Sequence, residues 1–469
     1  MSAVWIIAHS SGTQTLAEWG MTNVMLQRYN LGVETLSFTI PTQSIYSDPV
    51  FAYDDPIYLY RDMVLWFSGT VRDLPASVGG EGDGDGERDR QRYVVCNAWE
   101  RVQTIILQQR YTIAKADFSG IIGSWSSRVV LGQDQWGKPR RADLVISDVL
   151  GYANLVGGGM ATVASLPAWA TPPVETVRDI SCAEAVRRML AYVPDAVGWW
   201  DYTTTPPTLN IQRRAALAVQ TLDLDDKDVV ELVEGITPLN AAKPRGVVIV
   251  FVHTEEDGDG NPRLRETRQT AGATTGPRVI FATINLNTGE APPTGLATQF
   301  YGALSTLQWA GTIKLHQRDC SGALRPGMVL NLDNGRAAWA TMNATIQSTT
   351  EEILTGTTTA EFGAAEHLGL GDFVDVMRRW RERPPPDKFP EAQDNGTEGV
   401  DEQEEGTDPA PDGEDPLGPS GGDPDVEPED RLPNPSAGNP PISPTIDLIA
   451  CIGGVAKTVR VNGYTVSGG

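Results

Sequence analysis

The sequence predicts a mainly β protein with an α+β insertion, in which two β-barrels flank a mixed α/β domain and are followed by an exit helix, a disordered acidic linker and a C-terminal β-hairpin. Three observations predict this class. Stretches with the two-residue period of a half-buried strand recur towards both ends of the chain. Helical spacing of apolar residues is concentrated in the middle and in one late stretch. The 469 residues include 48 Gly, 33 Pro and 12 Trp, which suits a turn-rich β protein.

The chain is too long for one ordinary core, so several domains are expected. The predicted parts are a first barrel (1–116), an inserted mixed α/β domain (117–215), a second barrel (216–371), an amphipathic exit helix (372–386), a disordered Pro/Gly-rich linker (387–441) and a C-terminal β segment (442–469).

The first barrel is predicted from the strand-rich stretches VETLSFTIP, PIYLYRDMVLWFSGTVRDL and RYVVCNAWERVQTIIL. The second stretch carries aromatic residues that favour strands: Tyr58, Tyr60, Trp66 and Phe67. This part is therefore expected to be all β.

An acidic glycine-rich loop, GGEGDGDGERDRQ, lies between the last two of these stretches. Asp83, Asp85 and Gly86 match part of a calcium-binding EF-hand loop. The twelfth position counted from Glu81 is Arg92, however, where such a loop requires a bidentate glutamate. A solvated hairpin tip is expected instead.

The insertion contains two helical patterns, RADLVISDVLGYANLV and SCAEAVRRMLAYV. Ser181 and Glu184 form a capping box at the start of the second. Its apolar residues follow at i, i+3, i+4 and i+7: Val186, Met189, Leu190 and Val193. We expect this stripe to pack within the domain, above a hairpin in VGWWDYTTTPPTLNIQ whose Trp199 and Trp200 fill the core.

The second barrel is predicted from GVVIVFVHT, RVIFATINL, GTIKLHQRD and a closing meander that begins at LRPGMVLNLDNGRAAWATMNATIQ. In that last stretch Asn334-Gly335 is expected to form a two-residue hairpin turn, because these residues readily take positive φ. A further reversal is expected at Thr355-Gly356. No residue in the meander suggests chemistry, so it is interpreted as scaffold.

The rest of the chain changes composition twice. GDFVDVMRRWRER predicts the exit helix, which three prolines end. Residues 387–441 hold 17 acidic and 2 basic residues, a net of −15 that leaves −9 of the total −24 for the rest of the chain. Such a segment has little to bury and is expected to be a disordered tether. The final stretch alternates again, with a turn expected at Asn462-Gly463, and a hairpin of that size is expected to dock on a partner.

Composition excludes several classes of protein. The 4 cysteines lie far apart and are expected to be unpaired buried thiols: Cys96, Cys182, Cys320 and Cys451. The chain starts without a signal-peptide pattern, and its longest apolar runs are far short of the ~20 residues that cross a bilayer, so synthesis and folding in a cytoplasm are expected. No basic cluster is large enough to indicate nucleic-acid binding by counterion release.

Candidate catalytic residues are few. The 4 histidines are scattered and lack metal-binding spacing: His9, His253, His316 and His367. Asp319 and Cys320 follow His316 closely enough for a Cys/His pair, but Cys320 precedes a loop at a predicted strand end. Carboxylate pairs such as Asp54-Asp55 are common in any acidic protein, and a glycosidase needs a set separation that sequence does not give. The sequence therefore predicts no enzyme, no catalytic residue, no metal site and no cofactor.

The order of these parts resembles the baseplate or tail hub proteins of tailed bacteriophages, the late-control tail protein family. Three stretches carry the resemblance, which covers about residues 1–383: DDPIYLYRDMVLWFSGTVRDL, ISCAEAVRRMLAYVPDAVGWWDYTTTPPTLNIQ, and LRPGMVLNL through TTTAEFGAAEHLGLGDFVDVMRRWRER.

The resemblance implies a homotrimeric ring in the virion, at the tail tip or baseplate, with two tail-tube-like barrels from each subunit. Implied partners are the tail tube and distal tail protein, the tape measure protein, and tip or fibre proteins, with residues 442–469 as a candidate docking element. DNA would pass through during ejection without sequence-specific binding, and a body poor in basic residues suits such a conduit because it does not grip phosphates.

Two alternatives remain open. Relatives of this family can carry peptidase or lysozyme domains, so a tail-associated cell-wall hydrolase is one. The Trp and Tyr content suggests a carbohydrate-binding adhesin as the other, although core packing explains those aromatic residues more simply.

Overall fold

The computed structural model confirms a mainly β protein with several sheets. It describes residues 3–44, 48–73, 90–114, 121–134, 138–225, 230–239, 243–256, 261–286, 290–306, 308–316, 324–364, 446–452 and 455–461. The chain forms two compact units, Met1–Asp401 and Glu402–Gly469.

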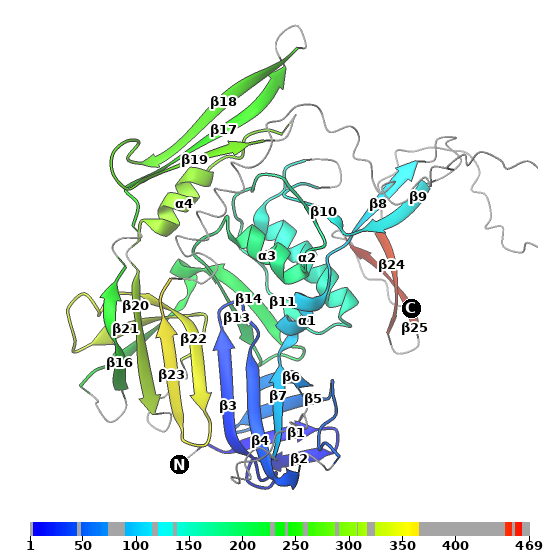
Figure 1. The fold of residues 1–469 in the computed structure, drawn as a ribbon, viewed down its shortest axis with the longest axis vertical. Helices are drawn as coiled ribbons and strands as arrows, with labels where there is room; N and C mark the ends of the chain where they lie inside the picture. Colours follow the sequence, from blue (N-terminus) through cyan, green and yellow to red (C-terminus); the bar gives the residue numbers. More distant parts are fainter. Residues whose placement is uncertain are drawn as a thin grey trace, which may run out of the picture. The chain divides into compact units, whose positions relative to one another are not determined.

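Unit 1 is built on a large sheet (Figure 1). Its main path of strands runs from edge to edge in the order β16-β20-β23-β22-β3-β4-β7-β6-β5-β1-β2. The bounds of these strands are β1 Trp5–His9, β2 Gly12–Thr15, β3 Thr22–Tyr29, β4 Thr35–Ser44, β5 Pro56–Arg61, β6 Val64–Asp73, β7 Arg90–Cys96, β16 Val230–Pro238, β20 Trp309–His316, β22 Ala344–Glu352 and β23 Thr357–Phe362.

The sheet is continuous because a strand from near the start of the chain pairs with one from near its end. β3 and β22 are antiparallel, with Tyr29 opposite Ser348 and Met25 opposite Glu352. Strands of the two predicted barrels therefore share one sheet. Among the described strands the path is open, with β2 and β16 each paired on one side, so closed barrels stay a prediction.

The half of the sheet from the start of the chain turns a corner. Figure 1 shows β1, β2, β5 and β6 running across β3, β4 and β7. Aromatic rings fill the inside of this bend: Phe38, Phe51 and Tyr93 are all buried, with ring centroids 5.3 to 5.7 Å apart. Gly69 lies at the corner, where an added Cβ would stand 2.4 Å from the Cys96 carbonyl oxygen.

The predicted hairpin at Asn334-Gly335 forms with a different turn. β21 (Met328–Asp333) pairs with β22 only through Val329 and Leu330, and ten residues separate the two strands. Asn334 takes φ 57°, but Trp339 folds back over Gly335, and its backbone carbonyl accepts from Leu332 N–H. A parallel partner, β15 (Ala218–Asp223), occupies β21 along its full length, which the sequence did not predict. The reversal at Thr355-Gly356 is confirmed, with Gly356 at φ 68°.

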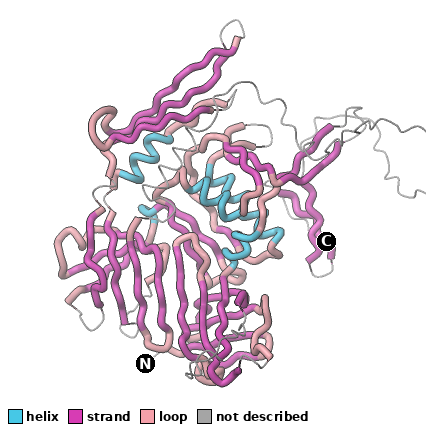
Figure 2. Tube along the Cα trace, in the orientation of Figure 1, coloured by secondary structure: helices cyan, strands magenta, loops and turns pink. Residues whose placement is uncertain are grey.

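The predicted insertion and the end of the first part together carry three helices and small sheets. Their elements are α1 Ala98–Thr104, β8 Gln109–Ala114, β9 Ile121–Ser126, β10 Arg128–Leu131, α2 Ala142–Val156, β11 Thr162–Val163, β12 Glu175–Arg178, α3 Cys182–Leu190, β13 Ala196–Asp201, β14 Thr208–Arg213 and the 3-10 helix η1 Arg214–Ala216. Figure 2 shows α1, α2 and α3 gathered together. The two predicted helices and the hairpin β13–β14 are confirmed.

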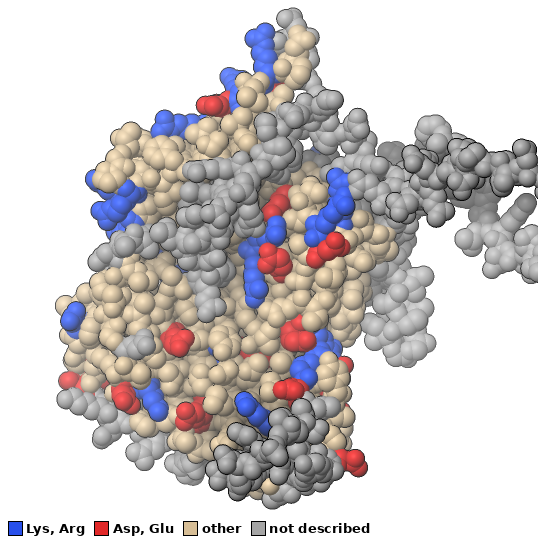
Figure 3. Space-filling view, viewed as in Figure 1, with Lys and Arg blue, Asp and Glu red and all other residues tan. Residues whose placement is uncertain are grey.

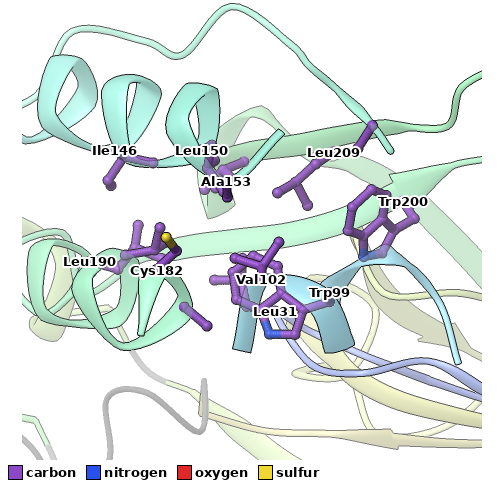
Figure 4. Close-up of a cluster of buried hydrophobic side chains, with 14 of the residues drawn as sticks. Leu31, Trp99, Val102, Ile146, Leu150, Ala153, Cys182, Leu190, Trp200 and Leu209 are labelled. Atoms are coloured by element: carbon purple, nitrogen blue, oxygen red, sulfur yellow. The ribbon is translucent and has the colours of Figure 1, made fainter. Parts of the chain in front are cut away.

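The predicted stripe of α3 is fully buried at Val186, Met189 and Leu190, as expected for packing within the protein. Figure 4 shows the cluster to which this helix contributes. Its labelled members come from the turn after β3, from α1, α2 and α3, and from β13–β14: Leu31, Trp99, Val102, Ile146, Leu150, Ala153, Cys182, Leu190, Trp200 and Leu209. Trp200 thus fills this core as predicted. Trp199 does not, because its ring lies against Gly327 in a separate small cluster.

One helix contradicts the predicted strands of the first part. Residues 98–104 were expected to continue a strand but form α1. Asn97 ends β7 and caps this helix by accepting from Trp99 N–H, and Trp99 and Val102 are then buried on one face. The polar cap at Asn97 therefore marks the point where the chain changes from strand β7 to helix α1.

A separate three-stranded sheet stands next to a fourth helix. β17 (Gly246–Glu256) pairs antiparallel with β18 (Pro262–Gly272) and parallel with β19 (Val279–Asn285), and α4 (Leu296–Leu304) packs on it. These strands lie outside the large sheet, although the sequence placed them with the second barrel. Neither β18 nor α4 was predicted.

Several predicted features lie outside the described residues: the acidic loop around Asp83, the exit helix 372–386 and the linker 387–441. In unit 2, β24 (Ile446–Ile452) and β25 (Val455–Val461) form an antiparallel hairpin in which Ile452 faces Val455. The turn expected at Asn462-Gly463 is also outside the described part. None of the helices in that part has the length and hydropathy that crossing a membrane requires.

Candidate functional site: a buried polar junction

Buried polar side chains gather where β3, β22 and the insertion meet, and we call them the junction. Its members are Arg28, Asn30, Glu34, Trp66, Asn97, Tyr202, Gln347 and Glu351. They come from three distant parts of the chain: the first strands, the end of β13 in the insertion, and β22. Polar groups at such depth need partners, and each pairing below fixes one part of the chain against another.

Arg28 on β3 is at the centre of the junction. Its side chain is 5% exposed; one guanidinium nitrogen donates to the Trp66 carbonyl at 2.7 Å, and another lies 3.5 Å from a Glu351 carboxylate oxygen. The guanidinium carbon is 5.0 Å from the Trp66 ring centroid and 6.0 Å from that of Tyr202, which adds cation–π contact.

Glu351 on β22 is fully buried, and the Trp66 indole N–H donates to it at 2.8 Å. Its neighbour Glu352 points the other way and is exposed, as the two-residue period of a strand requires. The sequence shows two adjacent glutamates but does not say which of them is buried. The pairing of β22 with β3 decides this.

Glu34, just before β4, is the second buried carboxyl, 1% exposed. The Tyr202 hydroxyl donates to it at 2.5 Å, and Asn97 donates to that hydroxyl at 3.4 Å. Burial raises the pKa of Glu34 to about 7, while Arg28 and the Tyr202 hydroxyl act in the opposite direction. Burial and the adjacent Glu34 carboxyl hold the pKa of Tyr202 well above its ordinary value.

An amide pair extends the junction. Asn30 Nδ2 donates to Gln347 Oε1 at 2.9 Å, and Asn30 Oδ1 accepts from Gly198 N–H at 2.8 Å. An added Cβ on Gly198 would stand 2.3 Å from Leu31 Cδ2, so a larger residue there would require the Leu31 side chain to move. The junction thus holds sheet and insertion together by directional bonds, and its groups point at one another.

Among the residues that the sequence singled out for chemistry, the described histidines His253 and His316 lie on different sheets. His253 bonds Thr267 on β18 at 2.9 Å, and His316 lies on β20, whereas Asp319, Cys320 and His367 fall outside the described residues. Cys96 and Cys182 are free and buried, as predicted. Burial raises the pKa of their thiols to about 11 and about 12, which makes them poor nucleophiles.

The Asp54-Asp55 pair splits between two sets of partners. Asp54 bonds Arg72 at 2.7 Å and Arg101 at 3.1 Å, whereas Asp55 accepts from the Ala52 N–H at 2.6 Å. The two carboxylates therefore hold local structure and do not form an acid/base pair. Within the described part of the chain, no group of acidic, His or Cys residues could hold a metal ion.

One hydrogen-bonded chain was missed by the sequence reasoning. His9 Nε2 lies 3.0 Å from Asp55 Oδ2, and His9 Nδ1 lies 2.9 Å from Ser11 Oγ. This is the order of a hydroxyl–imidazole–carboxylate triad. However, Nδ1 also accepts the Ser11 backbone N–H at 3.2 Å, so its one lone pair is shared within the β1–β2 turn. The imidazole is thereby tied to the turn.

Charges of both signs are scattered over the face that Figure 3 shows, and basic side chains gather towards the β17–β18 hairpin. Exposed arginines there include Arg263, Arg265 and Arg268 on β18. Arg265 is paired with Glu255 on the neighbouring strand. In the described residues of β17 and β18, these three arginines are balanced by Glu255, Glu256 and Glu266, so the two strands carry no net charge.

No family model matches this chain, and no curated protein matches it in sequence. Solved structures do. A tail protein from Neisseria meningitidis MC58 has a TM-score of 0.46 and 10% identity over 79% of this chain and 99% of that one. The prophage tail protein gp18 from Listeria monocytogenes EGD-e has 0.43 and 9% over 81% and 100%. The prophage MuSo2 43 kDa tail protein from Shewanella oneidensis has 0.46 and 10% over 77% and 98%. Phage tail proteins are thus what this chain is similar to in structure.

Proposed function

We propose that this chain is the structural hub of a bacteriophage tail tip or baseplate. Three copies form a ring that joins the tail tube to tip or fibre proteins and lines the channel through which DNA is ejected. The observation that carries the proposal is the β3–β22 pairing, which makes one continuous sheet from both ends of the folded body. A long sheet held at its middle by a buried polar junction is suited to be a wall.

The free edges of the sheet support a ring. In the described part of the chain, β2 and β16 each pair with one strand, and Leu232 and Val233 on β16 are exposed. Unpaired edges with apolar side chains are a liability for a lone monomer and are normally covered. Neighbouring copies around an axis would cover them.

The division into parts fits this role. We infer that strands from the segments 1–116 and 216–371 supply the wall, that 117–215 stands on it, and that 372–386 leads the chain out. The acidic stretch 387–441 then serves as a tether, and 442–469 docks on a tip or fibre protein. The low basic content of the body lets DNA slide, because few cations are available to neutralise phosphates.

The carbohydrate-binding alternative is less favoured because most of the described tryptophans are buried in a core cluster or packed against one. Trp5, Trp99, Trp169 and Trp200 are buried, and they therefore stabilise the fold. Trp125 is 46% exposed and packs beside Tyr152, with 6.1 Å between ring centroids. Among the described tryptophans Trp125 alone is exposed, which is weaker support for an adhesin than the sheet is for a wall.

Electron microscopy of phage particles labelled with an antibody to this chain tests the location. We expect the label at the tail tip, at the end away from the capsid. The hub proposal would be contradicted by label on the capsid or along the tail. It would also be contradicted by complete particles that carry no label.

A further inference from the structure

The junction contains more buried acid than buried base. Glu34 and Glu351 are 1% and 0% exposed, and Arg28, 4% exposed, is the one buried arginine in the described part of the chain. The Arg28 guanidinium donates to the Trp66 carbonyl and forms an ion pair with Glu351. Its ion pair is therefore with Glu351 and not with Glu34. The hydrogen bond to the Glu34 carboxyl comes from Tyr202, a neutral donor.

The charged and titratable groups that face Glu34 come from every element around it. Arg28 lies on β3, Glu351 on β22, Tyr202 after β13, and Arg325 before β21. Arg325 is only partly buried and also interacts with Asp201. Two carboxyls thus share one wholly buried cation, and a proton on Glu34 would remove the excess negative charge.

We propose that Glu34 carries a proton when the insertion is seated on the sheet, and that loss of this proton loosens the contact between them. The junction is then a proton-linked latch. Its moving side is the end of β13 with Tyr202 and Gly198, and its fixed side is β3 and the residues before β4. The inference does not depend on the ring, because every group in it belongs to one chain.

The direction of the pH dependence follows from the burial. Glu34 titrates near 4.5 when exposed and about 7 in the junction, so the folded chain keeps a proton that the unfolded chain has lost between these values. The stability that this proton contributes is complete below pH 4.5, falls as pH rises through the window, and is gone above about 7. The full shift corresponds to roughly a 300-fold change in the unfolding equilibrium constant.

Hydrogen exchange of the full chain tests the latch directly. The amides to follow are those of Gly198, which donates to Asn30, and Asn97, which donates to the Glu34 carbonyl. After correction for intrinsic exchange, we expect both to lose protection between pH 5 and pH 8. Glu34→Gln keeps an acceptor for Tyr202 but cannot ionise, so its protection is expected to stay flat. Glu231→Gln, on the exposed side of β16, should behave as wild type.

Tyr202→Phe is an independent variant. It removes the donor that lowers the pKa of Glu34, so the loss of protection is expected to move to higher pH. This variant also serves if Glu34→Gln fails to fold. The proposal would be overturned if wild type, Glu34→Gln and Tyr202→Phe all showed the same dependence of protection on pH. It would also be overturned if protection in the wild-type chain rose with pH.

Discussion

At the scale of single residues, two glycines differ in whether the structure has room for a side chain. A Cβ on Gly69 would stand 2.4 Å from the Cys96 carbonyl oxygen, which is backbone and cannot rotate away. A Cβ on Gly151, in the middle of α2, would meet nothing within 4 Å. The two positions therefore predict opposite signs for the same substitution.

Gly69→Ala is expected to destabilise the protein by about 2 kcal/mol or more, because β6 and β7 must separate at the corner of the sheet. Gly151→Ala is expected to stabilise it by about 1 kcal/mol through helix propensity. Denaturant unfolding of both variants measures the difference. Equal effects of the same sign would contradict the described corner.

Trp66→Phe tests the junction at its other carboxyl. The change removes the indole N–H that donates to buried Glu351 and is expected to cost about 1–3 kcal/mol of unfolding free energy. Trp125→Phe is the control, because that ring is half exposed, and its cost should stay below about 1 kcal/mol. If Trp66→Phe were as stable as the control, the hydrogen bond from Trp66 to Glu351 would not contribute to stability.

The chain from Asp55 through His9 to Ser11 gives a test of the hydrolase alternative. We expect no labelling of Ser11 by a fluorophosphonate probe, because the Ser11 backbone N–H shares the imidazole lone pair. Ser11→Ala with Ser10→Ala as its matched control identifies the site if labelling occurs. Label that disappears only in Ser11→Ala would favour the hydrolase.

At the scale of elements, the sequence predicted what local patterns decide. The α3 cap and its buried stripe, the hairpin β13–β14 and the turn at Gly356 all follow from neighbouring residues, and the structure confirms them. β18 was missed because PRLRETRQTAG has one large apolar residue, Leu264, and takes its form from pairing with β17. The tight turn at Asn334 was wrong because packing of Trp339 over Gly335 outweighs turn propensity.

The cap of α3 offers a test at this scale. Ser181 accepts from Glu184 N–H at 3.1 Å, so Ser181→Ala is expected to lower the unfolding free energy by about 1 kcal/mol. Ser181→Asp should recover most of it, because aspartate caps equally well. Loss of stability in both variants would mean that Ser181 acts through something other than capping.

At the scale of the whole molecule, what decides the architecture is pairing between residues that are far apart in the chain. Nothing in the alternation of β3 or β22 says that Tyr29 lies opposite Ser348, since period-two patterns do not name their partners. The junction could not be predicted for the same reason. In the sequence, Glu34 in VETLSF and Glu351 in TTEEI look like ordinary surface charges. Both are buried in the structure because of the long-range strand pairing.

We propose that this sheet is one wall segment of a three-membered ring. Sedimentation of the purified chain over a wide range of concentration tests the stoichiometry. We expect an equilibrium between monomer and trimer without a populated dimer. A stable dimer, or a monomer that persists at every concentration and in the presence of its tail partners, would contradict it.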